Sequence, residues 1–391
     1  MSDIIIAAAK RTPIGAFLGQ FTGFSTPKLG ATAIAAALQQ SGIAPGDVGE
    51  VLMGCVLPAN LGQAPARQAA LGAGLPPSAG CTTLNKVCGS GMKAIMLGHD
   101  LIKAGSANVV VAGGMESMTN APHMAAVRTG IRLGDGSMVD HMMWDGLTNP
   151  YDGKSMGVFA EQCADKYHFT REEQDAFATE SVRRAQEAVK SGVFADEIAT
   201  VTVPSRKGDV QASIDETPGK VDPAKIPTLK PAFRKENGTV TAASSSSISD
   251  GAAAVVLMSA DDAKTRGVKP LARIVAHATH SQEPQWFTTA PVGAIENVLK
   301  KAGWQVGDVD LFEVNEAFAV VAMAAMKDLS IPHEKLNVHG GACALGHPIG
   351  CTGARIVVTL LHALIHAGKK RGVASLCIGG GEATAIAIER I

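Results

Sequence analysis

Residues 109–116 read VVVAGGME, and residues 374–382 read ASLCIGGGE. Each is an apolar run, as expected of a buried strand, that leads into a glycine loop and then a glutamate. A helix-like segment precedes each run, one opening at Gly91 and the other at Gly353. The repeated order of helix, strand, glycine loop and glutamate predicts a duplicated α/β unit.

Most of the remaining chain alternates in the same manner between short apolar runs and longer helical patterns. This alternation predicts an α/β fold in which sheets are covered by helices. The expected strands are 4–8, 50–55, 108–112, 253–258, 271–278, 311–314 and 374–378. The expected helices are 26–41, 91–105, 171–191, 291–302, 317–329 and 353–367.

One long stretch interrupts this alternation. Residues 120–247 are richer in proline, charge and turn residues than the segments on either side, which indicates an inserted loop domain. We therefore expect an N-terminal half made of 1–119 and 248–270, a loop domain at 120–247, and a C-terminal half at 271–391.

The overall composition limits the kinds of partner. The 35 basic and 36 acidic residues nearly cancel, so no global field attracts nucleic acid or an anionic membrane, and we expect neither as a partner. No apolar segment is expected to reach the length of a membrane span. The seven cysteines include no CxxC pair, which favours reduced thiols and a cytoplasmic location.

A cysteine stands at the start of one of the expected helices, in the stretch NKVCGSGMKA of residues 85–94. The free amides of a helix N-terminus stabilise a thiolate, so Cys88 is a candidate nucleophile. The alternative is a small core residue. Residues 89–94 also match the dinucleotide pattern GxGxxA, but no acidic residue follows at the expected distance. Cys377, which replaces Val111 of the first copy, is a second candidate thiol.

Polar candidates come from two further motifs. In VHGGACALGHPIG, at 338–350, His347 is a candidate base for a thiol. The spacing of His339, Cys343 and His347 would suit a metal on a helix, but the glycines and the proline argue against a continuous helix there. In EVNEAFA, at 313–319, Asn315 is either a helix N-cap or a group that orients a water or a carbonyl.

Taken together, the motifs CGSGMKA, NEAFA, GGACALGHPIGCTGAR and CIGGGEATA closely resemble those of the thiolase family, over essentially the whole chain. The resemblance implies two duplicated β/α halves in a five-layer α/β/α/β/α sandwich with an inserted loop domain. It also implies coenzyme A thioester chemistry with no metal and no separate cofactor. A homo-oligomer is implied as well, usually a tetramer built as a dimer of dimers.

The resemblance assigns a role to each candidate. Cys88 matches the nucleophile that becomes acylated, and His347 matches the base that activates it. Cys377 matches the second thiol, which moves a proton at the incoming thioester. Asn315 matches the residue that fixes a water in one oxyanion hole, beside His347. The backbone N–H groups of Cys88 and Gly379 match a second oxyanion hole.

Further residues match positions that contact the substrate. Ser246 matches the serine at the pantetheine arm, and Ala243 stands in that loop where glycine is common. Ser155 stands where family members often have histidine. Met156 and Phe287 would narrow the acyl pocket. No arginine matches the one that often meets the adenosine part, so the phosphates are assigned to nearby basic side chains. These are Arg206, Lys207, Lys220 and Lys225.

Within the family, the chain resembles the acetyl-CoA acetyltransferase branch. The implied reaction is reversible Claisen condensation of two acetyl-CoA to acetoacetyl-CoA and CoA, by a ping-pong mechanism through S-acetyl-Cys88. The alternative is a broad-range 3-ketoacyl-CoA thiolase of fatty-acid β-oxidation. A decarboxylating ketoacyl synthase, which pairs one cysteine with two histidines, is disfavoured by Cys377.

Overall fold

The computed structural model describes residues 2–206 and 208–391. Its N-terminal half alternates strands and helices in chain order. The last two elements of this half, β10 and α6, follow the inserted segment. The elements of this half are β1 (Ile4–Arg11), β2 (Gly15–Ala16), α1 (Thr26–Ser41), β3 (Glu50–Gly54), α2 (Pro65–Gly72), β4 (Gly80–Leu84), α3 (Ser90–Lys103), β5 (Val109–Ser117), β10 (Ser249–Ser259) and α6 (Ala260–Arg266).

The C-terminal half repeats this order. Its elements are β11 (Ala272–Ser281), α7 (Ala290–Ala302), β12 (Leu311–Val314), α8 (Ala319–Leu329), α9 (Ala342–Leu345), α10 (Ile349–His366), β13 (Arg371–Ile378) and β14 (Glu382–Arg390). Short 3₁₀ turns lie at Pro45–Asp47, Pro218–Lys220, Pro223–Thr228, Pro284–Thr289, Val306–Asp308 and His333–Lys335.

The strand pairing confirms the predicted duplication. In the first half β3 pairs with β5 in parallel, and β5, β10 and β1 then follow as antiparallel neighbours. In the second half β12 pairs with β13 in parallel, and β13, β14 and β11 follow as antiparallel neighbours. The outermost strand β4 has its counterpart in a single parallel bridge between Phe312 and Leu336.

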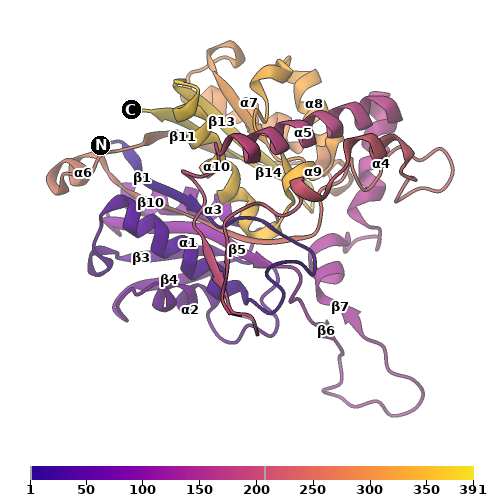
Figure 1. Ribbon diagram of the computed structural model, residues 1–391, viewed down its shortest axis with the longest axis horizontal. Coiled ribbons are helices and arrows are strands. Elements are labelled where there is room, and N and C mark those ends of the chain that lie inside the picture. The colour runs from indigo at the N-terminus through magenta and orange to yellow at the C-terminus, as the bar shows by residue number, and fades with distance from the viewer. Residues whose placement is uncertain (1, 207) are drawn as a thin grey trace.

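The two halves meet through equivalent elements. β1 pairs with its counterpart β11, antiparallel, over Ile4–Ile6 and Ala272–Ile274, which joins the strands of both halves into one ten-stranded sheet. One apolar cluster joins α3 and α10 to strands of both halves, whereas separate clusters lie under α1 and α2 and under α7 and α8. The arrangement confirms the five predicted layers, with α3 and α10 forming the middle one (Figure 1).

Glycines allow α3 and α10 to approach closely near their N-termini. A Cβ on Gly91 would lie 2.7 Å from Ala354 N, and one on Gly353 would lie 2.4 Å from Met92 N. These two glycines open the repeated helical segments in the sequence. Their contact brings the start of α3 beside the start of α10.

The glycines of the first repeat correct one expectation. β5 continues through Gly113 and Gly114 to Ser117, where a glycine loop was predicted. A side chain at either glycine would meet backbone, since a Cβ would lie 2.0 Å from Ala253 O or from Gly350 O. These glycines therefore permit close packing within a strand, and only the second copy, around Gly380, forms a turn.

The chain between β5 and β10 contributes no strand to the main sheet in its described residues. It contains β6 (His123–Met124), β7 (Val139–Asp140), a π-helical turn (Met142–Leu147), α4 (Met156–Tyr167), α5 (Arg171–Ser191), β8 (Val201–Val203) and β9 (Val210–Ala212). The loop between β6 and β7 protrudes from the body as an arm (Figure 1). Four apolar side chains of this arm are exposed: Val127, Ile131, Leu133 and Met138.

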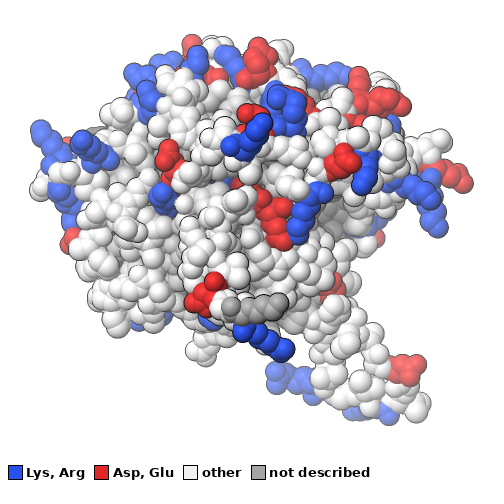
Figure 2. Space-filling view, viewed as in Figure 1, with Lys and Arg blue, Asp and Glu red and all other residues white. Residues whose placement is uncertain are grey.

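Most predicted elements are found with shifted ends. The helices α1 and α5 and the strand β12 match their expected bounds, whereas α10 begins four residues earlier than expected, at Ile349. With this extension α10 is long and apolar enough to cross a membrane by length and composition, contrary to expectation, and 89% of it is buried inside the protein. On the face drawn in Figure 2, acidic and basic side chains are interspersed.

Candidate active site

A cavity of about 250 Å³ lies where the N-termini of α3 and α10 meet the end of β13. Eight of the residues singled out in the sequence line it, from both halves and from the inserted segment. They are Cys88, Ser155, Met156, Ser246, Phe287, His347, Cys377 and Gly379.

A tight turn presents Cys88 directly before α3. Gly89 N donates to Lys86 O, and Ser90 N donates to Val87 O, both at 3.0 Å. Val87 has a φ of 45°, a left-handed conformation that is uncommon for a β-branched residue. The turn therefore imposes on Val87 a conformation that it would not adopt alone, and this places the Cys88 side chain at the cavity.

Burial raises the pKa of the Cys88 thiol to about 11, because a thiolate loses its hydration there. The backbone N–H groups of Gly379 and of Cys88 itself act in the opposite direction, since they donate toward the sulfur. Cys88 is therefore a thiol at neutral pH. Its surroundings already provide two donors for negative charge.

His347 lies between Gly346 and Pro348 at the start of α10. Its Nδ1 lies 2.6 Å from Thr352 Oγ1, and that hydroxyl donates to Pro348 O at 3.0 Å. Since the hydroxyl proton is used in this way, Nδ1 must carry the proton of the imidazole, which leaves Nε2 with a free lone pair. Nε2 is buried and has no partner among the described residues.

The imidazole is neutral. Burial lowers the pKa of His347 to about 3, and the positive charge of Arg355 acts in the same direction. Arg355 is itself held by Glu313, with 2.8 Å between Nη1 and Oε1. His347 can thus accept a proton only when a nearby anion forms to stabilise the imidazolium.

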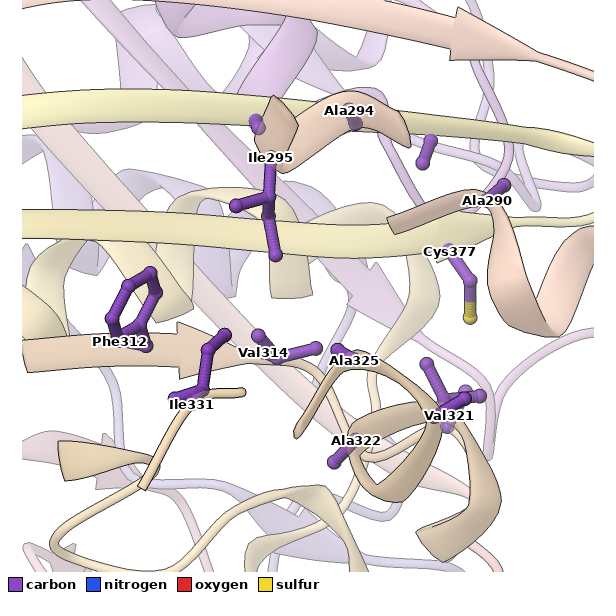
Figure 3. Packing of buried hydrophobic residues seen from close by; sticks show 14 of the residues in the cluster. Ala290, Ala294, Ile295, Phe312, Val314, Val321, Ala322, Ala325, Ile331 and Cys377 are labelled. Carbon is purple, nitrogen blue, oxygen red and sulfur yellow. The ribbon is translucent and has the colours of Figure 1, made fainter. Parts of the chain in front are cut away.

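Cys377 lies at the end of β13, opposite Ala383 of β14. Figure 3 shows its sulfur directed away from the strand, toward Val321 of α8. Burial raises the pKa of this thiol well above its usual value, and the neighbouring Cys88 raises it further. The two sulfurs, 289 positions apart in the sequence, therefore lie close enough to influence each other's ionisation.

Asn315 follows β12 and is buried without lining the cavity. Its backbone N donates to Ser375 O at 3.0 Å, which ties it to β13. The side-chain Oδ1 and Nδ2 have no partner among the described residues. Because buried polar atoms are nearly always hydrogen-bonded, this amide offers an unused donor and an unused acceptor that a bound water could satisfy.

Of the two loop residues expected to contact coenzyme A, Ser246 and Ala243, only one lies at the cavity. Ser246 lines the cavity, and both its backbone N and its Oγ donate to Ala317 O at 3.0 Å. Ala243 lies outside the cavity lining and packs with an apolar cluster that includes Val182 of α5. Ala243 and Ser246 are thus only three positions apart in one loop, but only Ser246 reaches the cavity.

None of the expected phosphate contacts within the described chain lines the cavity. Arg206 is exposed. Lys220 pairs with Glu216 at 2.6 Å, and Lys225 lies 3.9 Å from Asp222. Lys207 lies outside the described residues.

Aromatic rings that the sequence did not single out form one wall of the cavity. Phe318 stacks edge-on against Phe233 and Phe287, with ring centroids 5.9 and 6.4 Å apart. Phe318 belongs to the NEAFA motif, which could have indicated it. Phe233 comes from the inserted segment and carries no such signal.

Glu116 is a second group that the sequence did not single out. Its buried carboxylate accepts from the backbone N–H groups of Val56 at 2.9 Å, Leu57 at 3.2 Å and Gly350 at 3.0 Å. Burial raises its pKa to about 7, and these donors oppose the increase. Through Gly350 the carboxylate fixes the backbone just after His347. Its place in the repeated glycine–glutamate pattern was the available signal.

The spacing of His339, Cys343 and His347 does not produce a metal site in the described residues. Within residues 2–206 and 208–391, His339, Cys343 and His347 do not bring three ligand atoms together. Only Ala342–Leu345 is helical between them, and Gly346 has a φ of 105°. Glu316 instead accepts from Cys343 N at 3.1 Å and serves to hold this loop.

Fold and cavity together define the class: an α/β enzyme made of two copies of one unit around a pair of thiols. The chain belongs to the thiolase family, since the thiolase N-terminal domain matches residues 4–261 and the thiolase C-terminal domain matches residues 268–390.

Curated relatives cover the chain from end to end. A probable acetyl-CoA acetyltransferase from Dictyostelium discoideum is 51% identical, over 100% of this chain and 95% of the relative. Acetyl-CoA acetyltransferase 2 from Arabidopsis thaliana is 50% identical, over 99% and 97%. The crystal structure of the Acat5 thiolase from Ascaris suum in complex with coenzyme A matches with a TM-score of 0.95 and 42% identity, over all of both chains.

Proposed function

We propose that the protein is an acetyl-CoA C-acetyltransferase that condenses two acetyl-CoA to acetoacetyl-CoA and CoA, and runs in reverse as a thiolase. The observation that carries this proposal is one cavity that holds two thiols and a neutral imidazole with an unpartnered nitrogen. The names of the full-length relatives support it.

In the first half-reaction, Cys88 Sγ attacks the thioester carbonyl of acetyl-CoA. His347 Nε2 takes the thiol proton and returns it to the departing CoA sulfur, so that CoA leaves as a thiol and S-acetyl-Cys88 remains. The N–H groups of Cys88 and Gly379 stabilise the oxyanion, each donor contributing about 3 kcal/mol to the transition state.

In the second half-reaction, Cys377 as a thiolate removes a proton from the methyl group of a second acetyl-CoA. The enolate attacks the acetyl carbon on Cys88, forms the new carbon–carbon bond and expels the Cys88 thiolate. Cys377 reaches the thiolate form by giving its thiol proton to His347 Nε2, and the expelled Cys88 thiolate takes that proton back from His347, which restores both thiols and the neutral imidazole. His347 and a water held by Asn315 stabilise the enolate oxygen.

We expect the acyl pocket to be narrow. Met156 and Phe287 line the cavity together with Phe318, which favours acetyl and acetoacetyl groups over long chains. We expect thiolysis of acetoacetyl-CoA to be much faster than thiolysis of a long-chain 3-ketoacyl-CoA. Equal rates with the two substrates would instead identify a broad-range 3-ketoacyl-CoA thiolase.

The inserted segment, 120–247, supplies coenzyme A contacts and subunit contacts in this proposal. Ser246, near the end of the segment, meets the pantetheine arm, and basic residues such as Arg206 meet the phosphates. The exposed apolar arm supports a homotetramer assembled as a dimer of dimers. The free cysteines at seven positions fit the reducing environment of the cytoplasm.

Acetyl labelling tests the two thiols separately. Radiolabelled acetyl-CoA should label the wild type, whereas Cys88→Ala should take up no label. Cys377→Ala should keep the label but lose condensation, because it cannot form the enolate. Cys81→Ala, a cysteine outside the cavity, is the control and should keep both. Normal condensation in either cavity variant contradicts the assignment.

A further inference from the structure

Two histidines and an aspartate lie together where the far end of α3 meets β11. His99 and Asp100 are neighbours on α3, and His277 comes from β11. Asp100 Oδ1 lies 2.9 Å from His99 Nδ1 and 2.9 Å from His277 Nε2. One ligand atom from each residue falls within 4.8 Å of the other two, and none of the three residues lines the thiol cavity.

The three atoms form a donor set suited to a borderline transition-metal ion. Imidazole nitrogens and a carboxylate oxygen are common zinc ligands, and nickel and copper accept the same set. The two imidazoles are largely buried, with side-chain exposures of 15% and 16%, whereas Asp100 is 52% exposed. The histidines are therefore held in place while the carboxylate side stays open to an entering ion and to water ligands.

Replacing the present hydrogen bonds by metal bonds requires a proton shift on each ring and a displacement of the Asp100 carboxylate, since both nitrogens now point at its Oδ1. Each imidazole now donates an N–H to Asp100, so each must turn a lone pair to the ion by carrying its proton on the other nitrogen. One positive charge opposes binding, that of Lys301, whose Nζ donates to His277 O at 3.0 Å.

We propose that His99, Asp100 and His277 form a binding site for a divalent transition-metal ion, with zinc as the reference ion. Such an ion would link α3 of the N-terminal half to β11 of the C-terminal half. His99 lies nine residues beyond Ser90, which is about 14 Å along the helix, so the ion would not contact the substrate. The site is a structural clamp, and it was not evident from the sequence because Asp100 and His277 are 177 positions apart.

Zinc binding to metal-free protein tests the site. Thiols are first blocked with iodoacetamide, because thiolates also bind zinc. Equilibrium dialysis should give one tightly bound Zn²⁺ per chain in the wild type. The variants His277→Gln and Asp100→Asn should bind it at least about tenfold more weakly, since each lacks one ligand. The matched control is His366→Gln, because His366 also faces a carboxylate, Asp196 at 3.0 Å, but no third ligand atom joins this pair in the described part of the chain.

Thermal unfolding supplies a second readout. An ion that binds only the folded chain raises the melting temperature, so Zn²⁺ should stabilise the wild type and His366→Gln but not His277→Gln. Equal zinc binding by the wild type and the two ligand variants would overturn the site. Binding without any thermal shift would overturn the clamp. If His277→Gln does not fold, as judged by circular dichroism, Asp100→Asn carries both measurements.

Discussion

Cys88 and His347 line the same cavity as two neutral groups, and this has a measurable consequence. Burial raises the pKa of Cys88 to about 11 and lowers that of His347 to about 3. A proton transfer between them in the resting protein is therefore unfavourable. We therefore expect proton transfer from Cys88 to His347 only when a substrate is bound, because the negative charge can then move from the sulfur to the thioester oxygen.

Alkylation of Cys88 by iodoacetamide should therefore depend steeply on pH. Below its pKa the thiolate fraction grows tenfold per pH unit, so the rate should rise about tenfold per unit from pH 6 to pH 9. Incorporation of labelled iodoacetamide measures this rate, with Cys88→Ala as the blank. A plateau between pH 5 and pH 8 would reveal a preformed thiolate–imidazolium pair and contradict the neutral state.

At the scale of the elements, the contact between α3 and α10 determines the site geometry. Cys88 precedes one helix and His347 the other, and Gly91 and Gly353 allow their N-terminal turns to touch. The side chains that perform the chemistry are thus positioned by two residues that have no side chain.

Gly353→Ala should separate these helices. The new Cβ would lie 2.4 Å from a backbone nitrogen, which cannot move like a flexible side chain. We expect a loss of about 1–3 kcal/mol in the free energy of unfolding and a fall in kcat of about a hundredfold, because a displacement near 1 Å misaligns the reacting groups. Denaturant unfolding and steady-state assays measure the two effects.

Gly307→Ala is the matched control for this change, since a Cβ there meets nothing within 4 Å. It should leave both quantities nearly unchanged. A Gly353→Ala variant that is as stable and active as this control would show that the helix contact tolerates expansion.

At the scale of the whole molecule, one buried arginine joins the inserted segment to the main sheet. Arg11 of β1 donates to Glu197 at 2.5 Å and to both oxygens of Asp215, at 2.7 and 2.9 Å. All three side chains are fully buried. The pair of carboxylates holds the pKa of Arg11 above its usual value, although burial alone would lower it.

Arg11→Met should destabilise the protein by about 3–5 kcal/mol, because two buried carboxylates lose their counter-charge. The free energy of unfolding in denaturant measures this loss. Arg183→Met removes an exposed partner of Glu180 and should change stability little. Similar values for the two variants would mean that the buried network adds nothing to the attachment of the segment.

The protruding arm should govern assembly. Leu133 is 97% exposed in the single chain, so in a tetramer we expect it to lie at the contact between dimers. Leu133→Asp should halve the mass of the assembly in light scattering. Ile214→Asp, at an apolar side chain 59% exposed elsewhere, is the control. An unchanged mass for Leu133→Asp would place the contact on another surface.

The sequence was sufficient for features that repeat or carry local signals. The duplicated order predicted both halves, because glycine loops and helix starts mark the strand ends. The joint action of Cys88 and Cys377 in one site was implied by the resemblance to the thiolase family. Long-range polar contacts carried no such signal. The carboxylates that Arg11 binds lie 186 and 204 positions away, and strand β14 was missed because it follows the glycine turn without a break.

The two halves contact each other through equivalent elements, so they are related by a pseudo-twofold axis, as the subunits of a symmetric dimer are. β1 runs antiparallel to β11, and α3 lies against α10, so the axis offers two equivalent places for a reaction centre. At the second place Gly350 stands where Cys88 does, and Val111 stands where Cys377 does. In a homodimer of one such unit the two places would be identical, whereas a single chain with two halves can carry the reactive groups at one place and lack them at the other.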